Sequence, residues 1–237
     1  MDKPVYKRVL IKISGEALSG GDKVLDFQIT RTIGGVVKRC MDAGVQVGIV
    51  VGAGNIWRGA RDGEALMERS RADHMGMLAT MINCLALADV LEGLGADVRV
   101  QSAIDMRAIA EPYVRLRAIR HLEKGRAVIF GCGLGMPFFS TDTASVLRGM
   151  EIGADIVLLA KNVDGVYDDD PRKNPDAKKY DFLSPNAFLQ QHLTAMDATA
   201  ASLSMDNNIP VLLFALKDPE NIYRAVMGEK VGTIVKT

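Results

Sequence analysis

The chain has 237 residues, 48% of them hydrophobic, and its 29 Lys and Arg balance 29 Asp and Glu to a formal net charge of zero. This balance, without a long basic run, argues against nucleic acid as a partner, because phosphate-backbone binding needs concentrated positive charge. The three cysteines lack CxxC spacing, which fits neither a disulfide framework nor a zinc site, and the N-terminus lacks the apolar segment of a signal peptide, so we expect a cytoplasmic protein.

Short apolar runs rich in β-branched residues alternate with longer segments of helical period. The expected strands are residues 5–13, 45–51, 96–100, 127–131, 155–160 and 209–215. The expected helices are residues 28–43, 73–93, 112–124, 141–153, 194–207 and 219–227. This alternation predicts an α/β fold, a three-layer α/β/α sandwich with a mainly parallel central sheet. No repeat or linker divides the sequence, so we expect a single domain over residues 1–237, with residues 168–179 as an exposed loop.

The first candidate site lies where the first expected strand ends. Ligands of open α/β sheets bind beyond the carboxyl ends of the strands. A lysine at the end of a buried strand is costly unless it meets an anion, and the Ser14-Gly15 pair that follows Lys12 lets backbone N–H groups approach a phosphate. Lys12 is therefore a candidate contact for a transferred phosphoryl group, and the alternative is a lysine that merely reaches solvent there.

The second loop follows the strand at 45–51 and contains Gly52, Gly54 and Arg58. Glycines remove side chains where a ligand must touch the backbone, and an arginine can bind a phosphate through two hydrogen bonds. A dinucleotide-binding loop is the main alternative, but it is disfavoured because Trp57 replaces the third glycine of GxGxxG.

Asp73 is predicted to open the longest helix. The N-cap interpretation is favoured there, and the alternative is a carboxylate that accepts hydrogen bonds from a ribose diol. The apolar part of this helix, residues 75–90, is interrupted by Asn83 and Asp89 and falls short of the roughly 20 apolar residues of a membrane span. We therefore expect no membrane partner and interpret this segment as a core or interface helix.

The third loop, residues 131–143, joins a strand to a helix. It contains three alternating glycines, a proline and the pair Phe138-Phe139 before Ser140-Thr141-Asp142. The start of the following helix supplies N–H groups suited to a phosphate, and the aromatic pair can pack against a base. Asp142 either caps the helix or orients Lys12 or water around magnesium.

The fourth loop follows the strand at 155–160. Its Asp164-Gly165 pair is a tight-turn signal that predicts a hairpin, and Tyr167 beyond it can stack on a purine. The acidic run 168–170 is interpreted as a solvated loop, with metal binding as the alternative. Neither GxxxxGK[ST] nor HExxH occurs, so the four loops together predict a phosphate-handling enzyme that works by positioning and charge.

Six segments together resemble the bacterial-type UMP kinases of the amino acid kinase superfamily, nearly from end to end. They are KISGEAL at 12–18, GNIWRG at 54–59, DHMGMLAT at 73–80, PFFSTD at 137–142, VDGVY at 163–167 and VMGEK at 226–230. The resemblance implies the amino acid kinase fold and transfer of the ATP γ-phosphoryl group to UMP, giving UDP and ADP for pyrimidine nucleotide synthesis, with Mg²⁺ accompanying ATP.

The resemblance also implies roles for individual residues. The expected ATP site comprises Lys12, Ile13, Ser14, Gly15, Gly54, Arg58, Lys161, Asn162, Tyr167 and Asp170. The expected UMP site comprises Ala53, Asp73, Leu134, Gly135, Met136, Pro137, Phe138, Phe139, Ser140 and Thr141. Lys12, Arg58 and Asp142 are the expected catalytic residues, no residue is assigned as a direct metal ligand, and Asp197 resembles a family aspartate near the nucleotides.

The sequence departs from the family pattern at Ala53, where glycine is common, at Leu134, where threonine is frequent, and in a shortened segment near residues 19–26. The resemblance implies a homohexamer, inhibition by UTP, and GTP as a candidate activator that the shortened segment calls into question. Two alternatives remain. One is an amino acid or carbamate kinase of the same fold, which the Pro137-Phe-Phe loop disfavours, and the other is a nucleotide-binding regulator without catalysis.

Overall fold

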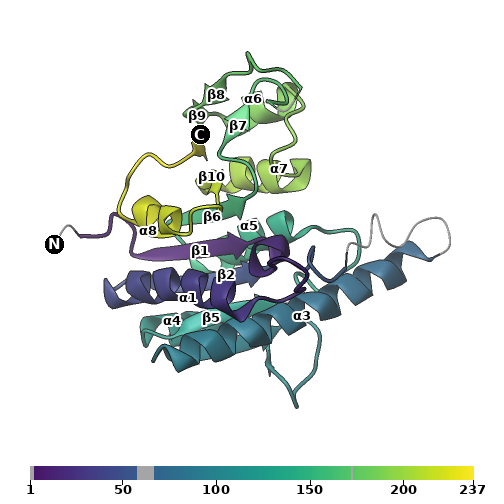
Figure 1. The fold of residues 1–237 in the computed structure, drawn as a ribbon, viewed down its shortest axis with the longest axis vertical. Helices are drawn as coiled ribbons and strands as arrows, with labels where there is room; N and C mark the ends of the chain where they lie inside the picture. The colour runs from purple at the N-terminus through teal and green to yellow at the C-terminus, as the bar shows by residue number, and fades with distance from the viewer. Residues whose placement is uncertain (1–2, 58–66, 172) are drawn as a thin grey trace.

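The computed structural model describes residues 3–57, 67–171 and 173–237 (Figure 1). The strands are β1 (Arg8–Ile13), β2 (Gln46–Val51), β3 (Val98–Ser102), β4 (Glu111–Pro112), β5 (Ala127–Gly131), β6 (Ile156–Lys161), β7 (Val166–Tyr167), β8 (Lys179–Tyr180), β9 (Phe182–Leu183), β10 (Val211–Ala215) and β11 (Thr233–Val235). The helices are η1 (Gly15–Leu18), α1 (Phe27–Asp42), α3 (Arg69–Gly93), α4 (Arg115–Glu123), α5 (Thr141–Ile152), α6 (Pro185–Gln190), α7 (Ala198–Asn207) and α8 (Glu220–Val226).

The central sheet has the strand order β4-β3-β5-β2-β1-β6-β10-β11-β9. Every pairing in it is parallel except that between β10 and β11. β1 lies between β2 and β6, so the loops that follow these three strands meet at one edge of the sheet. The predicted α/β fold with a mainly parallel sheet is confirmed.

Helices cover both faces of the sheet, as the apolar runs predict. Val9 and Ile11 of β1 point to the face covered by α1, α3 and α8, whereas Leu10 points to the face covered by α4, α5, α6 and α7. Figure 1 shows α1 and α3 side by side across the first of these faces. Because side chains alternate along a strand, Lys12 points with Leu10 toward α5.

Several boundaries differ from the sequence predictions. The helix predicted at residues 112–124 starts at Arg115, because Glu111–Pro112 pairs with β3 as an edge strand. The Asp164-Gly165 turn does not close a hairpin, since β6 belongs to the central sheet while β7 pairs with β8 in a separate one. The strands β7, β8, β9 and β11 have only two or three residues and α6 has six, which is too short for a periodic signal, so the sequence does not predict them.

α3 is longer than predicted because it begins at Arg69. By length and composition alone it could cross a membrane, contrary to the estimate made from residues 75–90. However, 61% of its most apolar window is buried inside the protein, so it is a core helix. Its buried side chains, such as Cys84, Leu87 and Leu91, pack on the face that Val9 and Ile11 share.

Candidate active site

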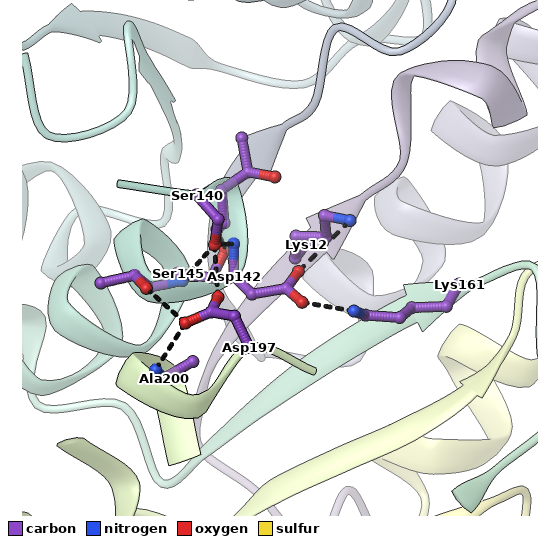
Figure 2. Close-up of polar contacts among 9 residues, drawn as sticks. Lys12, Ser140, Asp142, Ser145, Lys161, Asp197 and Ala200 are labelled. Carbon is purple, nitrogen blue, oxygen red and sulfur yellow. Dashed lines mark hydrogen bonds and ion pairs between the residues drawn. The ribbon is translucent and has the colours of Figure 1, made fainter. Parts of the chain in front are cut away.

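Asp142 lies between two lysines at the carboxyl edge of the sheet (Figure 2). The register pairs Lys12 of β1 with Leu159 of β6, so Lys161, two residues further along, points to the same face. The Lys12 Nζ lies 3.5 Å from Asp142 Oδ1, and the Lys161 Nζ donates a hydrogen bond to Asp142 Oδ2. Neighbouring parallel strands thereby place two cations on one buried carboxylate.

The charge state of Asp142 follows from these contacts. Its side chain is only 10% exposed, and that of Lys12 is 9% exposed. Burial alone would raise the pKa of the Asp142 carboxyl, but attraction from Lys12 and Lys161 outweighs it and holds that pKa below its usual value. The cluster therefore presents a fixed carboxylate and two ammonium groups, and an anionic phosphate is the ligand that such an excess of positive charge favours.

Asp142 sits in the first turn of α5 and does not cap it, so the N-cap interpretation is wrong. Ser140 is the N-cap, and its Oγ accepts hydrogen bonds from the backbone N–H groups of Asp142 (3.0 Å) and Thr143 (3.1 Å). The Ser140 hydroxyl in turn donates to Asp197, which also accepts from Thr143 Oγ1 at 2.8 Å and caps α7 through Ala200 N. Asp197 therefore anchors the start of the helix that carries Asp142, as Figure 2 shows.

The first and second loops are in close contact. A Cβ built on Gly15 would lie 2.5 Å from Gly52 O, so only glycine fits there. The Gly52 N–H donates to Ile13 O at 2.9 Å. The Ile13 side chain is fully buried in the core, which leaves only its backbone for a nucleotide. Ala53 is buried, and its carbonyl accepts from the N–H groups of Ile56 and Trp57 in the turn that contains Gly54. Arg58 lies outside the described residues.

Asp73 is not the N-cap of α3. The cap is Glu68, whose carboxylate accepts from Ser70 N, and Asp73 lies one turn inside the helix. Its Oδ2 accepts a hydrogen bond from the backbone N–H of Phe138 at 2.8 Å, and Arg69 Nε donates to it at 3.0 Å. Asp73 therefore joins α3 to the third loop, next to where the resemblance places the acceptor nucleotide.

The third loop carries exposed apolar side chains around a strained backbone. Met136, Phe138 and Phe139 are 61%, 67% and 49% exposed. Phe138 has a φ of 72°, a conformation that costs energy for an aromatic residue and indicates a functional constraint. Gly135 approaches Ala103 so closely that a Cβ would lie 3.0 Å from the Ala103 carbonyl oxygen. The half-buried Leu134, Pro137 and Thr141 complete this surface beside Asp73.

The fourth loop lines a cavity of about 910 Å³, which is large enough for a nucleotide. Lys161, Asn162, Tyr167 and Asp170 contribute to its walls. The Tyr167 hydroxyl donates to Asp164 Oδ1 at 3.0 Å, which fixes the ring at the cavity edge. Within the acidic run, the carboxylates of Asp168 and Asp169 accept backbone N–H groups of Lys178 and Asp170, so they shape the loop.

One site residue was missed by the sequence analysis. The Glu16 carboxylate, just after the first loop, accepts a hydrogen bond from Asn162 Nδ2 at 2.7 Å and so links the first and fourth loops. Its place within the Lys-Ile-Ser-Gly-Glu segment was the available signal. Lys12, Asp142, Lys161 and the four loops are thus brought to one edge of the sheet, on the described part of the chain.

Comparisons with known proteins agree with this geometry. The sequence model of the amino acid kinase family matches residues 7–219. The crystal structure of UMP kinase from Bacillus anthracis is 42% identical with a TM-score of 0.94, over 98% of this chain and 96% of that one. UMP kinase from Ureaplasma parvum is 38% identical with a TM-score of 0.93, over 100% of both chains. Uridylate kinase from Archaeoglobus fulgidus is 27% identical with a TM-score of 0.76, over 96% of this chain and 99% of that one.

Proposed function

The chain belongs to the amino acid kinase family, and from this premise we infer that it is a UMP kinase, which transfers the γ-phosphoryl group of ATP to UMP to give UDP and ADP. The observation that carries this inference is the likeness to two bacterial UMP kinases over essentially the whole chain, which includes all four candidate loops. The cluster of Lys12, Asp142 and Lys161 supports it, because one buried and one partly buried ammonium group suit a phosphate-rich site.

We propose that catalysis works by positioning and charge. Phosphoryl transfer places negative charge on the oxygens of the transferred group, and fixed cations in a dry site stabilise that charge. Lys12 would contact the transferred group, with Asp142 holding the Lys12 ammonium in place and Lys161 balancing the carboxylate. Arg58 would add a second cation at the junction of the nucleotides. No covalent enzyme intermediate is needed, because the UMP phosphate oxygen is itself the nucleophile.

The two substrates would lie at either side of this cluster. ATP phosphates would rest on Ser14, Gly15 and Gly54, and its base and ribose would fill the 910 Å³ cavity near Asn162, Tyr167 and Asp170. UMP would be held by Asp73 at the ribose and by the third loop, residues 134–141, around its phosphate and uracil. The exposed aromatic side chains of that loop support a base-containing acceptor.

Mg²⁺ would arrive with ATP and neutralise phosphate charge. Among the described residues no group of three or more His, Cys, Asp or Glu side chains gathers in metal-binding geometry. Mg²⁺ bound with ATP does not require such a group, because it is usually held by phosphate oxygens, waters and at most one or two carboxylates. Asp142 would accept hydrogen bonds from waters bound to this Mg²⁺ while it keeps Lys12 oriented.

The direct test is UDP formation from ATP and UMP, with and without Mg²⁺. CMP, aspartate, acetylglutamate and carbamate serve as competing acceptors. We expect turnover with UMP that requires Mg²⁺. Preferential phosphorylation of an amino acid or carbamate would replace the proposal with the other enzyme class, and tight binding of ATP and UMP without UDP would replace it with a nucleotide-binding regulator.

Asp73→Asn is expected to raise KM for UMP by about 10-fold, because a charged hydrogen-bond acceptor for the ribose is lost. KM for ATP should stay unchanged, since the Asp73 carboxylate contacts Phe138 of the third loop and Arg69 of its own helix. Steady-state kinetics with each substrate varied separately measure both values. Arg69→Gln is the matched control: it removes the ion pair with Asp73 and keeps the carboxylate, so KM for UMP should remain within about 3-fold. Equal changes in both KM values would contradict the assignment.

An exposed apolar stripe on α3 supports a homo-oligomer, and we propose the hexamer. Met75, Leu78, Ile82 and Leu85 are 38–52% exposed and repeat at helical spacing on the face opposite the core. Ile82→Glu is expected to shift the protein to smaller assemblies in size-exclusion chromatography with light scattering. Phe182 lies on β9 outside the stripe, and it is 51% exposed. Phe182→Glu is therefore the control variant and should leave the assembly unchanged. An unchanged mass for both variants would rule the stripe out as the interface.

The remaining proposals concern regulation and context. We propose feedback inhibition by UTP at the UMP site and treat GTP as a candidate activator, both testable in the UDP assay. We further propose a cytoplasmic protein of one domain over residues 1–237, acting in pyrimidine nucleotide synthesis. The three buried, unpaired cysteines Cys40, Cys84 and Cys132 support a reducing compartment.

A further inference from the structure

Asn83 is a fully buried amide in the middle of an apolar helix. It lies on α3, and its neighbours Cys84 and Leu87 are also fully buried. A buried amide destabilises the protein unless its polar atoms find partners. The partners of Asn83 therefore indicate why this helix carries a polar residue at that position.

The Asn83 side chain forms a closed pair with Asn55 of the second loop. Asn83 Nδ2 donates to Gly52 O at 2.7 Å and to Asn55 Oδ1 at 2.8 Å. Asn55 Nδ2 donates back to Asn83 Oδ1 at 3.1 Å and to Val24 O at 2.8 Å. The backbone carbonyls of Gly52 and Val24 fix the orientation of both amides, because a carbonyl accepts only from the nitrogen end.

This amide pair also supports the first loop. A Cβ on Gly15 would lie 2.5 Å from Asn55 Oδ1 and 2.5 Å from Gly52 O, so Gly15 rests directly on the two groups that Asn83 holds. The backbone bond from Gly52 N to Ile13 O closes the same contact. Asn83 thus fixes the wall against which the segment after Lys12 packs.

We propose that Asn83 is a positioning residue that sets the separation of the Lys12-Ser14-Gly15 loop and the Gly52–Gly54 loop without touching a nucleotide. The proposal rests on the proposed function, which assigns both loops to phosphate groups. In-line transfer requires the donor and acceptor phosphates to be aligned, and a shift of about 1 Å in the groups that hold them can slow a reaction roughly 100-fold. A purely structural amide would affect the stability of the fold but not the turnover of the folded enzyme.

The main test is Asn83→Leu, which keeps the number of side-chain heavy atoms and removes all the side-chain hydrogen bonds. We expect kcat for UDP formation to fall roughly 10- to 100-fold. The Kd for UMP measured without ATP should change less than about 3-fold, because Asp73 and the third loop remain in place. Leu87→Ala, one turn further along the same buried face, is the matched control. It should lower the melting temperature at least as much and leave kcat within about 2-fold below that temperature.

A second variant keeps the α3 core intact. Asn55→Ala removes the other half of the pair from a partly exposed loop and should lower kcat to a similar extent. Because both changes break one unit, the double variant should be no slower than the slower single variant. The positioning role would be overturned if the two losses of kcat multiplied in the double variant, or if both single variants kept the kcat of the unmodified enzyme. In either case, UDP formation by the unmodified enzyme would still uphold the proposed function. No UDP from the unmodified enzyme would overturn both.

Discussion

Replacing Lys12 with alanine is expected to lower kcat for UDP formation by about 1,000-fold while leaving the fold intact. Lys12 lies near the carboxyl end of β1, and its ammonium group lies 3.5 Å from Asp142 Oδ1 on the sheet face that Lys161 shares. Removing it takes away a fixed cation from the place where the transferred phosphoryl group would pass. Single-turnover kinetics with saturating ATP and UMP measure this loss without interference from product release.

The effect on UMP binding separates this role from a general loss of the site. The UMP contacts proposed for Asp73 and the third loop do not involve Lys12, so the Kd for UMP should change by less than about 10-fold. Lys38→Ala is the matched control, because Lys38 forms an exposed ion pair with Asp42 at the end of α1 that leads into the start of β2, away from the carboxyl ends of the strands. It should keep full activity. Near-normal turnover of a folded Lys12→Ala variant would remove the central residue of the proposed mechanism.

The strands and the lysine at the end of the first one follow from local sequence. A run such as Val9-Leu10-Ile11 is apolar on both sides because helices cover both faces of the sheet, and Lys12 stands out against it. The same logic located the glycine-rich loops after β2 and β5. The order of the strands in the sheet, by contrast, does not follow from local sequence. That Lys161 shares a carboxylate with Lys12 depends on β6 lying beside β1, and nothing local to either strand encodes that pairing.

The errors at helix starts have a common physical cause. Aspartate is a good N-cap, so the sequence indicates an N-cap interpretation for both Asp73 and Asp142, but both lie within the first two turns of their helices. α3 begins earlier because Glu68 caps a charged first turn that has no apolar period to signal it. An aspartate inside a helix is then available to a neighbouring loop, as Asp73 is to Phe138. Long-range pairs such as Asn55 and Asn83 leave no local signal.

Asp142→Asn is the second change expected to have a large effect. We expect kcat to fall by about 100-fold, because Lys12 loses the carboxylate that holds its ammonium group in place. The variant should also lose about 3 kcal/mol of unfolding free energy at pH 7, since two lysines remain in a largely buried site without their counter-ion. Asp42→Asn removes an exposed carboxylate from its pair with Lys38 and should change stability by only about 0.5 kcal/mol, with full activity.

The pH dependence of that stability loss identifies its origin. Lys12 and Lys161 hold the pKa of the folded-state Asp142 carboxyl below its usual value despite burial, which acts in the opposite direction. The carboxyl therefore contributes stability that is fully present above its unfolded-state pKa of about 3.9 and is lost as the pH falls through the lower folded-state value. Asparagine does not titrate. Urea unfolding of the unmodified protein and of Asp142→Asn should show a difference in unfolding free energy that is constant between pH 5 and 7 and narrows below about pH 4. A difference that stays constant throughout this range would mean that Asp142 is not held charged by the two lysines.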